Sequence, residues 1–199
     1  MRVLVAEDDA IIAIGLVTRL RSLGHEPLGP ARDGHQAVAI AARERPDLYL
    51  FDIDMPGLDG LSAAAALAAQ GLRRPIVVIT GVDDPTLIER SIATGVSAYL
   101  TKPIDDRELD AAIRLAAHRH AELAALEAEA AEARQALADR RLVEHAKGIL
   151  IAALGLTEPE AFRRIQRAAR ERNLRLADVA RQIVDQRALL DPPRGGEAG

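Results

Sequence analysis

The sequence predicts an α/β fold, a five-stranded parallel sheet covered by helices on both faces, followed by a long helix and an all-α three-helix bundle. Three observations predict it. Residues 1–103 alternate short apolar segments with helix-forming segments, the pattern of a doubly wound parallel sheet. Residues 104–147 contain no Gly or Pro and consist mainly of the strong helix formers Ala, Glu, Leu and Arg. Two shorter helical segments follow before a Pro- and Gly-rich end.

Local signals place each strand and helix of the first region. Aspartates precede helical segments as N-caps, and Gly or Pro ends them. The second strand contains Pro27 and Pro30, which cannot donate to a ladder, so we expect it at an edge of the sheet. The expected strands are 2–6, 26–31, 48–52, 75–80 and 98–101, and the expected helices are 10–23, 33–45, 62–70 and 84–95.

The long helix carries a heptad seam, because apolar residues recur at alternating spacings of three and four. An isolated helix would expose this seam, which either a second copy or packing on the chain's own N-terminal domain would cover. Of these two we expect a parallel homodimer, formed on activation. The seam comprises Leu123, Leu126, Ala130, Ala133 and Leu137.

The bundle contains the end of the long helix and two further helices. Gly148 falls inside the helical pattern, and Gly155 ends it. Thr157 as N-cap and Glu160 at the capping-box position predict a helix over 158–172. A third helix is expected over 176–190, followed by a disordered tail at 191–199.

Composition excludes several classes of protein. The absence of cysteine excludes disulfides and thiolate metal sites and fits a cytoplasmic location. No apolar run approaches the ~20 residues of a membrane span, so no membrane association is expected. Residues 1–133 hold 13 basic and 21 acidic residues, whereas residues 134–199 hold 13 and 9. This split predicts an anionic partner for the C-terminal part, the alternative being an ordinary solvated helix surface.

Three carboxylates follow two of the predicted strands. Asp52 ends the apolar strand 48–52, and Glu7 and Asp8 come directly after the first strand. Because the carboxyl ends of parallel strands meet at one edge of a sheet, we expect these groups to lie together. They would repel each other without a cation, and an oxygen-only ligand set indicates Mg²⁺.

Residues 1–117 resemble the receiver domain of two-component response regulators. The resemblance rests on Glu7-Asp8, on Asp52 in Asp-x-x-Met-Pro-Gly-x-Asp-Gly, on Thr80 after the fourth strand, and on Tyr99-Leu-Thr-Lys102-Pro103. It implies the flavodoxin-like strand order 2-1-3-4-5, Asp52 as phosphoacceptor, and a sensor histidine kinase as phosphodonor.

The same resemblance implies roles for the surrounding residues. The Mg²⁺ ligands would be Asp8, Asp52 and the backbone carbonyl of Asp54, with Glu7 acting through water. Glu7 departs from the commoner Asp-Asp pair but still supplies a carboxylate. Lys102 and Thr80 would contact the phosphoryl group, a cis bond would precede Pro103, and Tyr99 would turn inward as Thr80 moves.

Residues 137–190 resemble the ANTAR domain, a three-helix RNA-binding antitermination module, with 118–136 as a helical coiled-coil linker. The resemblance rests on Ala146-Lys147-Gly148, on Thr157-Glu-Pro-Glu160-Ala-Phe162 and on Leu176-Ala-Asp178-Val-Ala180. It implies binding to paired hexanucleotide-loop hairpins in nascent mRNA, which blocks terminator formation, with Lys147 as an RNA contact.

Arginines on the second helix of the bundle fit that expectation. Arg163, Arg167 and Arg170 share one helix face, with Arg164 at its margin, which is the arrangement of a phosphate-binding stripe. Phe162 is expected to be a core residue. The competing interpretations are a DNA-binding helix-turn-helix and a module that serves only protein dimerisation. An enzyme is not expected, since residues 134–199 hold no convergent catalytic set.

Overall fold

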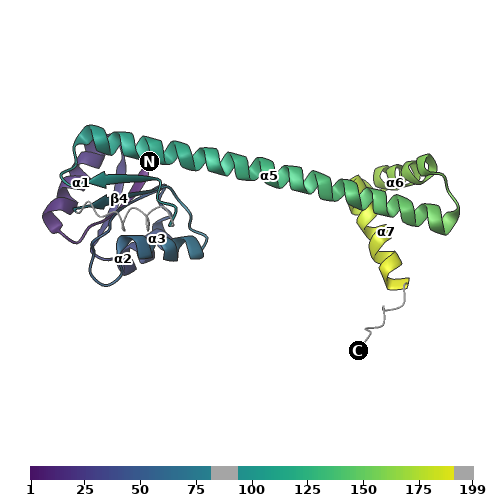
Figure 1. Ribbon diagram of the computed structural model, residues 1–199, viewed down its shortest axis with the longest axis horizontal. Helices are drawn as coiled ribbons and strands as arrows, with labels where there is room; N and C mark the ends of the chain where they lie inside the picture. Colours follow the sequence, from purple (N-terminus) through teal and green to yellow (C-terminus); the bar gives the residue numbers. More distant parts are fainter. Residues whose placement is uncertain (82–93, 191–199) are drawn as a thin grey trace, which may run out of the picture. The chain divides into compact units, whose positions relative to one another are not determined.

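The computed structural model describes residues 1–81 and 94–190 (Figure 1). The chain divides into two compact units, Met1–Ala125 (unit 1) and Leu126–Gly199 (unit 2), and one helix, α5 (Asp106–Leu154), contributes residues to both. The helix expected to begin at Asp84 and the tail at 191–199 lie outside the described residues. Within the described ranges, no helix has both the length and the apolar character needed to cross a membrane.

Unit 1 contains a five-stranded parallel sheet with the order β2-β1-β3-β4-β5, which confirms the expected topology. The proline-containing strand lies at an edge, as predicted. All four strand pairs are parallel, so the carboxyl ends of the strands share one edge of the sheet. The strands are β1 (Arg2–Ala6), β2 (Glu26–Ala31), β3 (Leu48–Asp52), β4 (Ile76–Thr80) and β5 (Ala98–Thr101).

Helices bury both faces of the sheet. One face packs against α1 (Ala10–Ser22) and the first turns of α5, and the other against α2 (Gly34–Glu44) and α3 (Gly60–Ala69) (Figure 1). Alternate residues of β1 enter opposite cores: Val5 packs with the α1 and α5 side chains, and Leu4 with those of α2 and α3. Burial on both faces explains why the central strands read as unbroken apolar runs.

Three helices begin at positions that differ from the prediction, α2 by a single residue at Gly34. The expected start of α3 at residue 62 is wrong, because the Asp59 carboxylate accepts a hydrogen bond from the Ser62 backbone N–H at 2.7 Å, which makes Gly60 the first helical residue. The long helix begins at Asp106, since the Asp105 carboxylate accepts hydrogen bonds from the N–H groups of Arg107 and Glu108 at 2.7 and 2.8 Å. Each aspartate satisfies donors that a helix start leaves unpaired.

Unit 2 is a three-helix bundle made by the end of α5 with α6 (Glu158–Arg172) and α7 (Leu176–Leu190). The bounds of α6 and α7 are those predicted, and α5 passes through Gly148 to end before Gly155. The Glu160 carboxylate accepts hydrogen bonds from the backbone N–H and hydroxyl of Thr157 at 2.8 and 2.6 Å, which fixes the start of α6. The core contains Val143, Ala146, Ile165, Ala169, Val179 and Ala180.

Candidate functional site

The three predicted carboxylates lie together at the carboxyl edge of the sheet. Carboxylate oxygens of Glu7, Asp8 and Asp52 all lie within 4.8 Å of one another, and we refer to these residues as the acid cluster. Glu7 is 1% exposed and Asp52 2% exposed, whereas Asp8 is open to solvent. The ends of β1 and β3 therefore hold two buried acids beside one that faces water.

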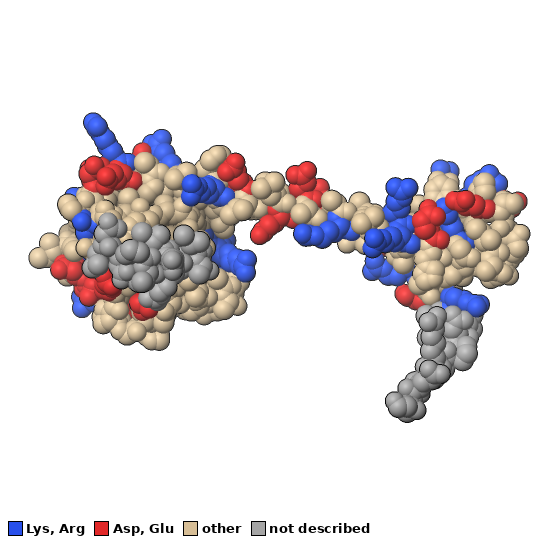
Figure 2. Space-filling model, in the orientation of Figure 1, with Lys and Arg blue, Asp and Glu red and all other residues tan. Residues whose placement is uncertain are grey.

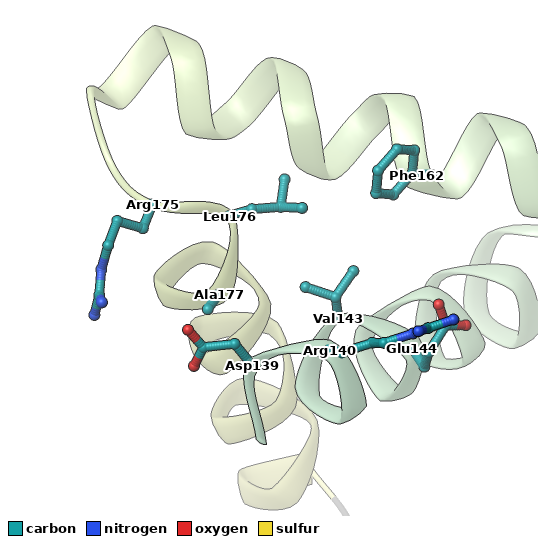
Figure 3. A pocket seen from close by; sticks show the side chains of 8 residues that line it. All are labelled: Asp139, Arg140, Val143, Glu144, Phe162, Arg175, Leu176 and Ala177. Carbon is teal, nitrogen blue, oxygen red and sulfur yellow. The ribbon is translucent and has the colours of Figure 1, made fainter. Parts of the chain in front are cut away.

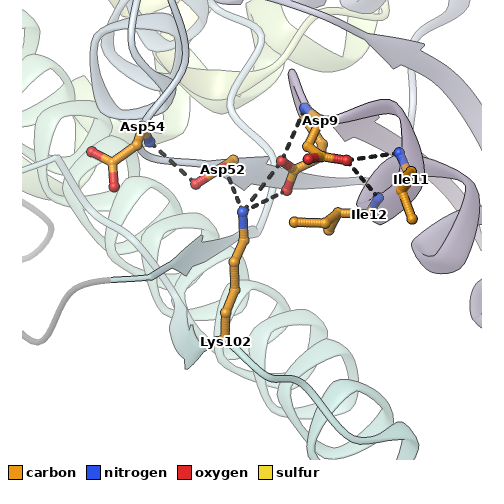
Figure 4. A network of polar contacts seen from close by, with 7 residues as sticks. Asp9, Ile11, Ile12, Asp52, Asp54 and Lys102 are labelled. Carbon is orange, nitrogen blue, oxygen red and sulfur yellow. Dashed lines mark hydrogen bonds and ion pairs between the residues drawn. The ribbon is translucent and has the colours of Figure 1, made fainter.

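Lys102, which follows β5, supplies a cation to this cluster. Its Nζ atom lies 2.7 Å from Asp52 Oδ2 and 2.9 Å from Glu7 Oε2 (Figure 4). The Lys102-Pro103 peptide is cis, as the family resemblance implied. One ammonium faces three carboxylates, so negative charge remains in excess. The surplus charge and the oxygen-only donor set fit a divalent cation such as Mg²⁺.

Burial and charge act on the titration of two of these groups. Burial raises the pKa of Glu7, and the charge of Asp52 acts in the same direction, against the lowering effect of Lys102. Burial lowers the pKa of Lys102, but its hydrogen bonds to Asp52 and Glu7 outweigh that effect and leave the pKa raised. Lys102 therefore remains a full positive charge at neutral pH.

Backbone groups near the acid cluster complete the site. The Asp54 N–H donates to Asp52 Oδ1 at 3.1 Å, so the Asp54 backbone lies directly beside that carboxylate while its own side chain is exposed. The Lys102 N–H donates to the Thr80 carbonyl oxygen at 2.8 Å. Thr80 is fully buried at the end of β4, and Tyr99 is half-buried on β5. The structure thus brings Thr80 and Lys102 to the edge that holds the acids.

Gly60 has a role that the sequence motif did not reveal. The expected helix over 62–70 left it outside, but it is the first residue of α3 and lies against the end of β3. A Cβ atom at this position would lie 2.1 Å from the carbonyl oxygen of Asp52. Real Cβ atoms do not approach an oxygen so closely, so any side chain here would displace the residue that carries the buried carboxylate.

The Gly60→Ala variant is expected to lose about 3 kcal/mol of unfolding free energy, because the added methyl overpacks against backbone that has no space to move. Gly15→Ala in α1 is the matched control, since a Cβ there meets nothing within 4 Å. Alanine also favours helix, so the control should gain up to ~1 kcal/mol. Urea unfolding followed by circular dichroism measures both. Equal stabilities of the two variants would contradict the close approach.

The raised pKa of Glu7 predicts a pH dependence of stability without metal. The folded state binds a proton on Glu7 at pH values above its ordinary pKa of 4.5, where the unfolded state has lost it. The unfolding free energy therefore falls as pH rises from that value through the raised pKa. The melting temperature in EDTA measures this effect. It should fall less with rising pH in the Glu7→Gln variant, whereas the Asp8→Asn variant, changed at an exposed carboxylate, should show the same fall as the natural chain. A Glu7→Gln profile as steep as that of the natural chain would show that Glu7 does not cause the pH dependence.

The arginines expected to bind RNA lie on the surface of unit 2. Arg163, Arg164, Arg167 and Arg170 are all exposed on α6, and Figure 2 shows basic side chains on the visible face of this unit. Within the described residues none of the four forms an ion pair. Their charges are therefore available to an anionic partner.

Lys147 lies in different surroundings from those expected of an RNA contact. It is 8% exposed, and its Nζ atom lies 2.7 Å from Glu144 Oε2 and 2.7 Å from Glu158 Oε1. The same atom lies 5.9 Å from the ring centroid of Phe162. Lys147 thus ties α5 to the start of α6, with its charge neutralised inside the bundle.

Comparison with known proteins accounts for both units. Residues 3–114 match the model of the response regulator receiver domain, and residues 131–184 match that of the ANTAR domain. The chain is 44% identical to the transcriptional regulatory protein PdtaR of Mycobacterium tuberculosis over 184 residues, 92% of this chain and 89% of the relative.

Solved structures resemble the first unit. The signal receiver domain of a modulated diguanylate cyclase from Desulfovibrio desulfuricans is 39% identical, with a TM-score of 0.56 over 59% of this chain and 94% of that one. The BeF3-activated receiver domain of RstA from Klebsiella pneumoniae is 30% identical, with a TM-score of 0.55 over 59% and 98%. This chain therefore belongs to the response regulators, as a non-enzymatic regulatory member that joins a receiver domain to a C-terminal ANTAR domain.

Proposed function

We propose that this response regulator accepts a phosphoryl group on Asp52 from a sensor histidine kinase and then binds paired RNA hairpins in nascent mRNA to prevent transcription termination. The observation that carries the proposal is the buried Asp52 carboxylate, 2.7 Å from Lys102 Nζ and beside two further acids. The unpaired arginines of α6 support the RNA-binding half. The proposed boundaries are 1–117 for the receiver, 118–136 for the helical linker and 137–190 for the RNA-binding domain.

The arrangement suits phosphoryl transfer to a carboxylate. An oxygen of Asp52 forms the new O–P bond while the P–N bond of the donor phosphohistidine breaks, and the imidazole leaves. Lys102 is already directed at the accepting carboxylate, so its ammonium can neutralise a phosphoryl oxygen without first leaving water. Thr80 would donate its hydroxyl to the phosphoryl group, and Tyr99 would repack with it. The negative charge of the incoming phosphoryl group would thus be neutralised by side chains that are already in position.

Mg²⁺ is the proposed cofactor of this step. Asp8, Asp52 and the backbone carbonyl of Asp54 would hold it, with Glu7 acting through water. Bound there, the ion would offset the repulsion between the acids and the incoming phosphoryl oxygens. The hydrogen bond from the Asp54 N–H to Asp52 Oδ1 holds the Asp54 backbone beside the carboxylate that would bind the ion.

The proposed output is tested by RNA binding with and without phosphorylation. The probe is the tightest binder selected from a pool of two-hairpin RNAs with randomised six-nucleotide loops. Acetyl phosphate with Mg²⁺ should tighten binding, and affinity should fall steeply with salt because phosphate contacts release counterions. Tighter binding to a DNA duplex would instead support a helix-turn-helix output. Failure to bind either nucleic acid would leave unit 2 as a dimerisation module.

We further propose that phosphorylation favours a homodimer through the seam of α5. Leu123 and Leu126 are each 61% exposed and Leu137 is 51% exposed, which is unusual for three leucines on one helix face. A second copy would bury them and hold two RNA-binding domains together, so that paired hairpins bind with avidity.

Leu126→Glu is expected to weaken the phosphorylated dimer by about tenfold or more, because two buried carboxylates would face each other in a parallel seam. Ala128→Glu carries the same charge on the opposite face of the helix and should dimerise like the natural chain. Sedimentation velocity of the phosphorylated proteins distinguishes them. Equal dimerisation of both variants would show that the seam is not the interface.

A further inference from the structure

Unit 2 contains a cavity of about 370 Å³ that is open on one side and lies between α5, α6 and the start of α7 (Figure 3). Its apolar wall is formed by Val143, Phe162 and Leu176, whose side chains point toward one another. Four charged residues also line it, two acidic and two basic: Asp139, Arg140 and Glu144 on α5, and Arg175. Ligand pockets in proteins combine an apolar wall with a few polar groups in this way, at volumes from ~300 Å³ upward.

We propose that this cavity binds a single unpaired base of an RNA loop. The inference deepens the RNA-binding function proposed above and rests on it. Proteins read RNA loops by drawing unstacked bases onto aromatic rings or guanidinium planes and bonding their edges. The cavity supplies the ring of Phe162, the guanidinium of Arg140 and the carboxylate of Glu144, so that it offers a stacking surface, donors and acceptors at one place.

The burial and contacts of the lining side chains favour an RNA base over an apolar ligand. Phe162 is the one aromatic residue of 126–199. It is half-buried, packing against the core of the bundle and also lining the cavity. Arg140 is exposed and has no hydrogen bond or ion pair within the described part of the chain. Arg175 also lines the cavity, but its guanidinium is held by Asp178 at 2.9 Å. Arg140 is thus the guanidinium that remains for a ligand.

The charge of α6 fits a nucleic acid. Arg163 follows Phe162 directly on α6 and Arg167 lies one turn later, both exposed, although neither lines the cavity. The phosphates that flank a bound base would lie outside the cavity, on a bundle surface that carries this positive charge. An apolar helix from a protein partner would gain nothing from these charges. The bundle therefore provides for the backbone as well as for the base.

This assignment gives Lys147 a positioning role. Its ammonium lies over the Phe162 ring, 5.9 Å from the centroid, and is itself fixed by Glu144 and Glu158. A cation over an aromatic face restrains the ring. Lys147 thereby sets the orientation of the stacking surface without contacting RNA.

The experiment is a scan of abasic sites in the loops of the selected two-hairpin RNA, read by Kd with the phosphorylated full chain. One loop position should stand out, with affinity about 10- to 100-fold weaker when its base is removed, the scale of losing one stacked base. Phe162→Leu and Arg140→Gln should each bind the intact RNA more weakly and lose sensitivity to that position. Arg134→Gln is the control, because Arg134 is an exposed arginine on α5 that does not line the cavity. This variant should keep the sensitivity of the natural chain to that position.

The outcomes separate this inference from the function on which it rests. If both variants bind RNA but retain the full penalty at the abasic position, the base lies elsewhere and the inference fails while RNA binding stands. If the natural chain binds no hairpin RNA, both fail. Because Arg140 is exposed, its variant keeps the test valid even where Phe162→Leu perturbs folding.

Discussion

Asp52→Asn is expected to reduce phosphorylation by at least about 10³-fold, the scale of loss when a covalent mechanism loses its nucleophile. The amide that replaces the carboxylate is neutral and a poor nucleophile, and among the described residues no other carboxylate is as well placed. Glu7 is buried with its oxygens on Lys102 and the Asp9 N–H, and Asp8 faces solvent. Intact-mass spectrometry after incubation with acetyl phosphate and Mg²⁺ measures the product directly.

Asp54→Asn provides the matched control for that experiment. Its side chain is exposed, and its proposed contribution to the site is made by the backbone, which the substitution leaves in place. Phosphorylation should therefore persist at close to the natural rate. An Asp52→Asn protein that still gains the mass of a phosphoryl group would place the acceptor on another residue.

The same variant tests the link between the two domains. If phosphorylation drives dimerisation and RNA binding, the Asp52→Asn protein should show unphosphorylated behaviour in both assays whether or not the phosphodonor is present. A response of RNA affinity to phosphodonor in this variant would mean that the donor acts elsewhere. Receiver and output would then be coupled by some route other than the acid cluster.

The sheet and the acid cluster were predictable because they depend on chain order and strand ends. A run such as 48–52 has no polar side to face water, so it belongs inside a sheet with helices on both faces. Once such strands run parallel, residues that end them must meet at one edge. The proximity of Glu7 to Asp52 therefore follows from topology alone, although 45 positions separate them in the sequence.

The exact start of a helix depends on a single hydrogen bond that the sequence does not single out. Asp59 is a good N-cap residue, but the prediction began the helix only at Ser62. In the structure the Asp59 carboxylate takes the cap, so that Gly60 enters the helix and meets the carbonyl of Asp52. A glycine needed for close approach looks, in sequence, the same as one needed for a turn.

Lys147 shows why contacts between separate helices were not predictable. A lysine within a basic module suggests a phosphate contact, since long ammonium side chains usually face water. Here Glu144 lies one turn before Lys147, and Glu158 begins the next helix. Both carboxylates form ion pairs with the ammonium. That pairing depends on the turn at 155–157, whose geometry no periodicity reveals. The cavity beside Phe162 is formed by the same packing and was not foreseen either.

The triple variant Arg163→Gln, Arg167→Gln, Arg170→Gln is expected to weaken hairpin RNA binding on the order of 100-fold at low salt. It should also lower the slope of log affinity against log salt by about 2, because each phosphate contact to single-stranded nucleic acid releases less than one counterion. Fluorescence anisotropy over a series of salt concentrations gives both quantities. The three side chains are exposed, so the fold should be unaffected.

The control for the arginine variant must remove the same charge elsewhere. Arg21, Arg32 and Arg73 are exposed in unit 1, and replacing them by Gln changes the net charge of the chain equally. If binding depended only on net charge, both triple variants would lose affinity alike. If the arginines of α6 form the contact surface, only the α6 variant should lose affinity and salt slope together. A loss of affinity with an unchanged slope would instead indicate that these side chains act through base or shape recognition, since phosphate contacts cannot be removed without releasing fewer ions.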